Sequence, residues 1–272
     1  MNTLINKFRI FLFPLSFFYW AITNCRNLFY TIGFFVSKRL PVPTISVGNI
    51  TAGGTGKTPT VIAITQILLE MDRYPCIVSR GYGRKSSGCI TVSDGKSLLT
   101  SWEEAGDEPF MMAKRLPNVP VVVDERKYRG AQYAIDNFNV DIIILDDAFQ
   151  HRSVERDLDI VLFNCGDPKE YYRMLPYGRL REPVRSVMRA DLILWSRADK
   201  NSPPVTLKKA FRFQKEKQIM SGLKVQDNID LNGLKVFAFC GIGDPDSFYN
   251  ILEEKGAKIL DLIIFPDHHA YS

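Results

Sequence analysis

Short apolar segments rich in valine and isoleucine alternate with longer amphipathic stretches along most of the chain after residue 40. Strands are predicted at 44–49, 76–79, 119–124, 140–147, 158–164, 191–196 and 234–242, and helices at 57–71 and 125–138. The predicted strands are apolar at nearly every position, which is typical of a parallel sheet covered by helices on both faces. The pattern therefore predicts an α/β fold with a doubly wound, mostly parallel sheet.

Two segments interrupt this alternation. Residues 80–98 combine glycine and serine turn signals with one short strand, which indicates an excursion or a β-ribbon. Residues 200–232 are polar and lack a clear period, so we interpret them as a connection to a second, smaller α/β lobe. The predicted organisation is an N-terminal segment at 1–40, a core at 41–225 and a C-terminal lobe at 226–272.

The N-terminal segment contains two apolar runs, 10–22 and 28–36, that are dense in aromatic residues. Neither run reaches the ~20 residues that a simple membrane span needs. Basic residues flank the runs, a pattern that favours a helix in the headgroup region of an anionic membrane or a short re-entrant anchor. The alternative is a helix buried in the protein core.

Charge and cysteine content exclude other classes of protein. The net charge of the 272-residue chain is +5, and it resides in residues 1–40, which hold Lys7, Arg9, Arg26, Lys38 and Arg39 and no acidic side chain. The rest of the chain is neutral, so no basic face for nucleic acid is expected. Five scattered cysteines without a CxxC pair indicate a reduced cytoplasmic protein rather than a disulfide framework or a zinc site.

A glycine-rich segment, ITAGGTGKTP, joins the first predicted strand to the first predicted helix. Such a loop wraps phosphate in backbone N–H groups at a helix N-terminus. The residues expected to bind the nucleotide are Gly53, Gly54, Thr55, Gly56, Lys57 and Thr58. Lys57 is expected to reach the β- and γ-phosphates, and Thr58 to bind Mg²⁺. Thr51 stands where the strict phosphate-loop pattern has its first glycine; a chance GKT in a turn is the alternative.

A pair of carboxylates ends the apolar strand at 140–147. In phosphate-loop proteins, an acidic residue near the metal usually occupies such a strand end. Either Asp146 or Asp147 is therefore a candidate to hold Mg²⁺ directly or through water. A pair of this kind can also cap a helix. The phosphate loop upstream favours the metal role.

Motifs along the whole chain resemble one family. They are SVGNITAGGTGKTP (46–59), SRGYGR (79–84), GDEP (106–109), DERKYRG (124–130), LDDAFQH (145–151), LPYGRLREP (175–183) and PDHH (266–269). In this order they resemble the tetraacyldisaccharide 4′-kinase family, although Ala148 replaces a usual glycine. Family members usually continue further, so the second lobe is expected to be incomplete here.

The resemblance implies a function in lipid A biosynthesis of Gram-negative bacteria. The γ-phosphate of ATP would pass, with Mg²⁺, to the 4′-hydroxyl of tetraacyldisaccharide 1-phosphate and give lipid IVA. The implied location is the cytoplasmic face of the inner membrane, whose lipids the N-terminal segment would contact. Neither nucleic acid nor an obligate protein partner is expected.

The resemblance also implies roles in catalysis. Asp107 is the expected base that accepts the proton of the hydroxyl, supported by His268 of the second lobe. Glu108 is expected to orient Mg²⁺ or a substrate group. Asp107 could instead be a helix N-cap, and His269 could replace His268. For His151, a structural role and a catalytic role remain equally open.

The candidate substrate residues are Arg80, Tyr82, Arg84, Arg181 and Glu182. Arg181 could neutralise charge on the transferring phosphoryl group or on the 1-phosphate of the substrate, since a guanidinium suits phosphate oxygens. Arg181 and Glu182 could also form a surface ion pair, and the segment around Tyr82 could be a solvated loop.

The rival interpretation is a membrane-associated P-loop ATPase or GTPase that acts as a switch. The early lysine found in many dimeric ATPases of that kind is missing between Gly48 and Lys57, and SRAD (196–199) only weakly imitates a guanine-binding signature. A switch would hydrolyse nucleotide without lipid, whereas a kinase would consume ATP in step with lipid product.

Overall fold

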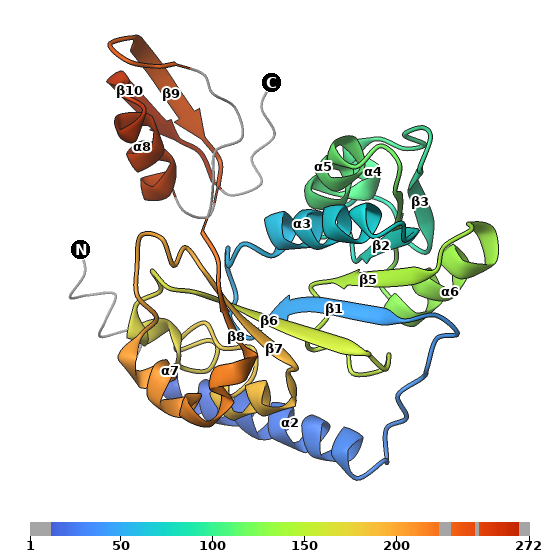
Figure 1. Cartoon of the computed structure of the whole chain (residues 1–272). Helices are drawn as coiled ribbons and strands as arrows, with labels where there is room; N and C mark the ends of the chain where they lie inside the picture. The colour runs from blue at the N-terminus through green and yellow to red at the C-terminus, as the bar shows by residue number, and fades with distance from the viewer. Residues whose placement is uncertain (1–11, 223–229, 243–244, 267–272) are drawn as a thin grey trace. The chain divides into compact units, whose positions relative to one another are not determined.

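The computed structural model describes residues 12–222, 230–242 and 245–266. The chain divides into two compact units, Met1–Gly222 and Leu223–Ser272, which are described separately. An eight-stranded sheet forms the centre of the first unit, in the order β3-β4-β2-β5-β1-β6-β7-β8 (Figure 1). Its strands are β1 (Thr44–Asn49), β2 (Pro75–Ser79), β3 (Ile90–Asp94), β4 (Pro120–Val123), β5 (Ile142–Asp146), β6 (Leu158–Asn164), β7 (Leu192–Ser196) and β8 (Gln218–Met220). Every described pairing except β3 with β4 is parallel, which confirms the predicted α/β class.

Helices cover both faces of this sheet. They are α2 (Phe13–Thr31), α3 (Lys57–Glu70), α4 (Trp102–Ala105), α5 (Asp107–Arg115), α6 (Lys127–Asn137) and α7 (Val205–Ala210), with 3-10 turns η1 (Lys169–Tyr171), η2 (Val184–Arg189) and η3 (Arg212–Lys217). Alternate residues of β5 enter different cores: Ile144 packs with α3 and α5, and Leu145 packs with α6. Because successive strand residues point to opposite faces, the helices lie on both sides.

The central strands deliver polar groups to one edge of the sheet. β1 lies between β5 and β6, and all six of its residues are buried. The carboxyl ends of these parallel strands carry Asn49, Ser79, Asp146 and Ser196. In open parallel sheets, ligands bind outside these carboxyl ends, so this edge is where a site is expected.

Gly48 allows a close contact beside that edge. A Cβ added there would lie 2.7 Å from both Cβ and N of Phe149, a side chain that is fully buried. We expect Gly48→Ala to lower the free energy of unfolding by about 2–3 kcal/mol, because neither backbone can yield without repacking the core. Urea unfolding measures this cost. Gly54→Ala is the matched control, since nothing lies within 4 Å of its added Cβ, and equal costs for the two variants would contradict the contact.

The two interrupting segments add strands to the sheet. Residues 80–98 do not form a separate ribbon: β3 joins the sheet edge by pairing antiparallel with β4. Residues 200–232 were expected to be a polar connection, but they contain α7, η3 and β8, and β8 pairs with β7. Leu207 of α7 and the following Phe211 share a core with Trp195 of β7, which explains why this segment folds onto the sheet.

Helix α2 has an unusual distribution of polarity. Its buried positions are the polar residues Ser16 and Thr23. Its exposed positions include the apolar residues Phe13, Leu15, Phe17, Phe18, Ile22 and Leu28. Among the described residues, no helix combines the length and the hydropathy that a membrane crossing requires. The membrane role of this segment therefore stays a prediction.

The second unit is a small α/β arrangement. Strands β9 (Lys235–Cys240) and β10 (Lys258–Ile264) pair in parallel, and α8 (Pro245–Glu254) connects them along the chain. A parallel pair needs such a crossover connection. The unit buries Ala238 and Cys240.

Candidate active site

The glycine-rich segment forms the loop between β1 and α3 that the sequence predicts. Asn49, at the end of β1, donates a hydrogen bond of 2.8 Å from Nδ2 to Oγ1 of Thr55. Ser196 Oγ, at the end of β7, donates to the carbonyl oxygen of Thr55 at 2.9 Å. Gly56 is the N-cap of α3, and Lys57 is its first residue. The loop is thus held from two strands, with the positive end of the helix dipole behind it.

A second chain segment, residues 179–181, lies along the phosphate loop. Ala52 N donates to the carbonyl oxygen of Arg179 at 2.7 Å, and Arg181 N donates to that of Ile50 at 2.7 Å. The Arg179 guanidinium stacks 3.7 Å over the ring of Tyr171, and its NH1 lies 3.0 Å from where a Cβ would stand on Gly53. Arg179 was missed in the sequence, although its neighbour Arg181 was chosen from the same motif.

Asp147 binds the two cations of the loop region. Its carboxylate accepts hydrogen bonds of 3.0 and 2.9 Å from NH1 of Arg181 and lies 3.7 Å from Nζ of Lys57. Burial raises the pKa of Asp147, but the charges of Lys57 and Arg181 outweigh it and hold the pKa below its ordinary value. The carboxylate is therefore anionic at neutral pH and holds both cations beside the phosphate loop.

Asp146 lies in a different environment and has an unused oxygen. Its Oδ2 accepts a hydrogen bond of 2.8 Å from Ser79 Oγ, while Oδ1 is buried without a partner among the described residues. Burial raises the pKa of Asp146, with Lys127 opposing the shift. A buried oxygen of this kind is costly unless something binds it. A hard cation with an oxygen-rich shell fits that requirement.

Glu108 joins the same cluster from α5. Its carboxylate interacts with the Thr58 hydroxyl, and burial together with the charge of Asp146 raises its pKa. In the described part of the chain, no group of three or more His, Cys, Asp or Glu side chains is arranged to hold a metal alone. Mg²⁺ usually takes one or two carboxylates together with phosphate oxygens. The residues present therefore fit an ion that arrives with a nucleotide.

Lys127 lies behind Asp146 and was missed in the sequence. Its side chain is 1% exposed. Its Nζ donates to the carbonyl oxygens of Asp146 at 2.6 Å and Val78 at 3.1 Å. Burial lowers its pKa to about 8, although the charges of Asp146 and Asp147 oppose the shift. Lys127 thus ties the ends of β5 and β2 together and adds positive charge beneath the two carboxylates.

Asp107 begins α5 next to the SRGYGR loop. The N-cap of α5 is Gly106, so Asp107 does not take the capping position considered for it. A Cβ on Gly106 would lie 2.9 Å from the carbonyl oxygen of Tyr82, and one on Gly81 would lie 2.5 Å from that of Ala105. This contact places exposed Tyr82 beside exposed Asp107, and both could reach a substrate.

Two candidate substrate residues have other partners. The Arg84 side chain is 4% exposed, pairs with Glu125 and donates to the carbonyl oxygen of Gly88 at 2.7 Å. Glu182 is fully buried and binds Arg189 with an N–O distance of 2.8 Å. Neither is a surface group, because each side chain is itself buried and its charge is compensated by its partner.

The remaining candidates are divided between the site and the undescribed part of the chain. Arg80 follows β2 at the sheet edge, is exposed, and acts electrostatically on Lys127 and His151. His268 and His269 lie outside the described residues. The structure thus brings together the loop residues, both aspartates, Glu108 and Arg181.

His151 gives the fold a dependence on pH. Burial, reinforced by the charges of Lys127 and Arg80, lowers its pKa from 6.5 to about 4. Between these values the unfolded chain binds more protons than the folded chain, so stability falls as the pH decreases from about 6.5 to about 4. The expected loss from this residue is roughly 2 kcal/mol.

Urea unfolding at about pH 7.5 and about pH 4.5 measures that loss. His151→Gln should lose less stability than the wild type over the same interval, because glutamine does not titrate. Equal losses in the two proteins would contradict the shift.

Comparisons with known proteins identify the family of the chain. A family model described as Tetraacyldisaccharide-1-P 4′-kinase matches residues 8–272. The chain is 43% identical over 265 residues to the tetraacyldisaccharide 4′-kinase of Aquifex aeolicus (strain VF5), covering 96% of this chain and 82% of that protein. It is 42% identical over 274 residues to the tetraacyldisaccharide 4′-kinase of Chlorobaculum tepidum, covering 97% of this chain and 78% of that protein.

A solved structure extends the similarity to three dimensions. The crystal structure of the "apo" form of LpxK from Aquifex aeolicus in complex with ATP matches with a TM-score of 0.82 at 39% identity. The match covers 97% of this chain and 84% of that one. A family match over nearly the whole chain, close relatives and the same fold all agree. The chain belongs to the tetraacyldisaccharide-1-P 4′-kinase family, whose members are phosphotransferases that act on a hydroxyl group.

Proposed function

We propose that the chain transfers the γ-phosphate of ATP to the 4′-hydroxyl of tetraacyldisaccharide 1-phosphate at the carboxyl ends of β1 and β5. One observation carries this assignment of the site: Lys57 and Arg181 converge on Asp147 beside the phosphate loop, with the partnerless oxygen of Asp146 next to them. That arrangement supplies positive charge and a metal-binding oxygen where a triphosphate would end.

The loop and its cations bind the nucleotide in this proposal. Backbone N–H groups of the loop and the N-terminus of α3 cradle the phosphates. Lys57 and Arg181 form ion pairs with Asp147 in the structure. In the complex with ATP they turn toward the γ-phosphate and stabilise its charge during transfer. The Thr58 hydroxyl and the free oxygen of Asp146 would hold Mg²⁺, with Glu108 orienting its shell. Mg²⁺ held there would supply positive charge to the phosphate oxygens during transfer.

Asp107 is the proposed base. It accepts the proton of the attacking 4′-hydroxyl, and its exposed place at the start of α5 leaves it accessible to an acceptor. Arg80 and Tyr82 belong to the loop that packs against the start of α5, and they are proposed to contact the disaccharide headgroup. His268 is proposed to support Asp107, on the strength of the sequence resemblance.

The exposed face of α2 is proposed to contact the membrane that holds the lipid substrate. Its apolar side chains include Phe18 at 64% and Ile22 at 68% exposure. Burying such a face in the interfacial region is favourable, and the aromatic side chains suit that depth. The proposed location is the cytoplasmic face of the inner membrane, with lipid A disaccharide 1-phosphate and membrane lipids as partners.

Transfer of radiolabelled γ-phosphate to lipid A disaccharide 1-phosphate in detergent micelles tests the function. Equal amounts of ADP and phosphorylated lipid, with little ATP consumed when lipid is omitted, are the expected result. ATP hydrolysis that proceeds without lipid and yields no labelled lipid would overturn the proposal in favour of a nucleotide switch.

A further inference from the structure

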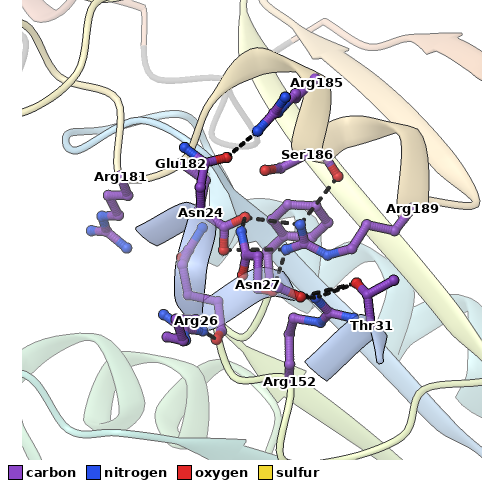
Figure 2. A network of polar contacts seen from close by, with 12 residues as sticks. Asn24, Arg26, Asn27, Thr31, Arg152, Arg181, Glu182, Arg185, Ser186 and Arg189 are labelled. Atoms are coloured by element: carbon purple, nitrogen blue, oxygen red, sulfur yellow. Dashed lines mark hydrogen bonds and ion pairs between the residues drawn. The ribbon is translucent and has the colours of Figure 1, made fainter. Parts of the chain in front are cut away.

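Glu182 is a carboxylate buried at the junction of three chain segments. It is fully buried, and both of its oxygens are bound. Arg189 of η2 donates to Oε2 at 2.8 Å and to Oε1 at 3.2 Å, and Asn27 of α2 donates to Oε2 at 2.9 Å (Figure 2). Burying a charge is costly unless every oxygen is satisfied, so this geometry is strongly constrained.

The constrained residue adjoins the phosphate-binding machinery on one side. Arg181 precedes it directly and reaches Asp147. Arg189 also donates to the carbonyl oxygen of Phe149 at 3.2 Å, and its guanidinium lies 4.1 Å over the Phe149 ring. Phe149 follows Asp147 by two positions. The ion pair of Glu182 with Arg189 therefore fixes the backbone on both sides of the Arg181–Asp147 contact.

Helix α2 holds the same two segments from the other side. Its Tyr19 hydroxyl donates to the carbonyl oxygen of Arg181 at 3.1 Å. Its Arg26 donates to the carbonyl oxygen of Gln150. The Gln150 side chain donates in turn to the carbonyl oxygen of Asn49 at 2.8 Å. The polar side of α2 thus binds the backbone of Arg181 and of Gln150, and the Gln150 side chain in turn binds the end of β1.

We propose that Asn27 and Glu182 are positioning residues, through which α2 sets the place of Arg181 against Asp147. This rests on the proposed function, because it assigns Arg181 to the transferred phosphate. Asn27 holds Glu182, Glu182 fixes the backbone of Arg181, and Arg181 delivers its charge beside Lys57. Helix α2 is accordingly a structural part of the active site, in addition to the membrane contact proposed for its outer face.

Asn27→Ala tests the proposal against a matched control, Asn24→Ala. Asn24 is the same residue type on the same helix, nearly one turn earlier, and it pairs with exposed Arg185. In the lipid phosphorylation assay with the full chain, Asn27→Ala is expected to lower kcat about tenfold, with the KM for ATP within about twofold, since the loop backbone is untouched. Asn24→Ala should stay near wild type. Equal kcat values in the two variants would overturn the proposal.

A double-mutant cycle separates positioning from general destabilisation. If Asn27 acts through Arg181, then Asn27→Ala should cost nothing further when Arg181 is already alanine, whereas independent effects would add. Tyr19→Phe provides a milder second variant, which removes only the hydroxyl bound to Arg181 and should show the same dependence. Additive losses in both cycles would contradict the proposal. An inactive wild type would instead contradict the proposed function.

Discussion

Replacing Lys57 with alanine is expected to lower kcat/KM for lipid phosphorylation about a thousandfold. Removing one preorganised charge at a developing phosphoryl group costs about 10²–10³ in rate. Lys57 starts α3 at the phosphate loop, and its Nζ lies 3.7 Å from the Asp147 carboxylate. Without it, Arg181 is the cation of the described residues that remains ion-paired with Asp147. Steady-state transfer of labelled phosphate to lipid measures the loss.

The control for this variant is Lys96→Ala. Lys96 is exposed in the turn after β3, away from the sheet edge that carries the site, and its removal should leave activity unchanged. A loss smaller than about tenfold for Lys57→Ala would show that the loop binds ATP without this charge and would contradict the assignment.

Asp107→Asn is expected to lower kcat by at least about a hundredfold, because general base catalysis contributes about 10²–10⁴. Asparagine keeps the size of the side chain and removes its ability to accept the proton. Asp107 is exposed and does not cap α5, so the melting temperature should stay near that of the wild type. The KM for ATP should also be retained, since the phosphate loop is unaffected.

The matched control is Asp136→Asn, an exposed carboxylate near the end of α6 that accepts a hydrogen bond from Gln132. It should behave as wild type in the same labelled transfer assay. Transfer that survives Asp107→Asn would keep the kinase and remove Asp107 from the role of base. The two substitutions with the largest expected effects therefore test separate halves of the site, the nucleotide side and the acceptor side.

Local signals explain why the nucleotide side could be predicted from the sequence. The loop before Lys57 and the acidic end of β5 each depend on a few consecutive residues, so their chemistry and geometry are encoded together. The parallel sheet followed from apolar segments, of which β1, β2 and β5 are buried at every position. Asp146 and Asp147 could not be told apart, because their different partners come from Ser79 on one side and Arg181 on the other.

Long-range pairing explains the failures. Charged residues are usually exposed, so nothing near Arg84 signals that it is buried against Glu125, and nothing near Glu182 signals its contact with Asn27. Lys127 is similar: its partners, the carbonyl oxygens of Val78 and Asp146, are supplied by strands far along the chain. Strand β8 is only three residues long and is defined by its pairing with β7. Such elements depend on the assembled sheet more than on their own sequence.

The reversed polarity of α2 determines how this helix can change during evolution. Outer positions such as Phe18 and Ile22 are exposed, so other side chains of similar hydrophobicity should be accepted there. Inner positions such as Tyr19 and Asn27 make single, directed hydrogen bonds and should tolerate almost no replacement. A saturation mutagenesis of the helix should therefore show a helical period in which the polar residues are the immutable ones. The outer face would then be free to drift as lipid composition changes between lineages.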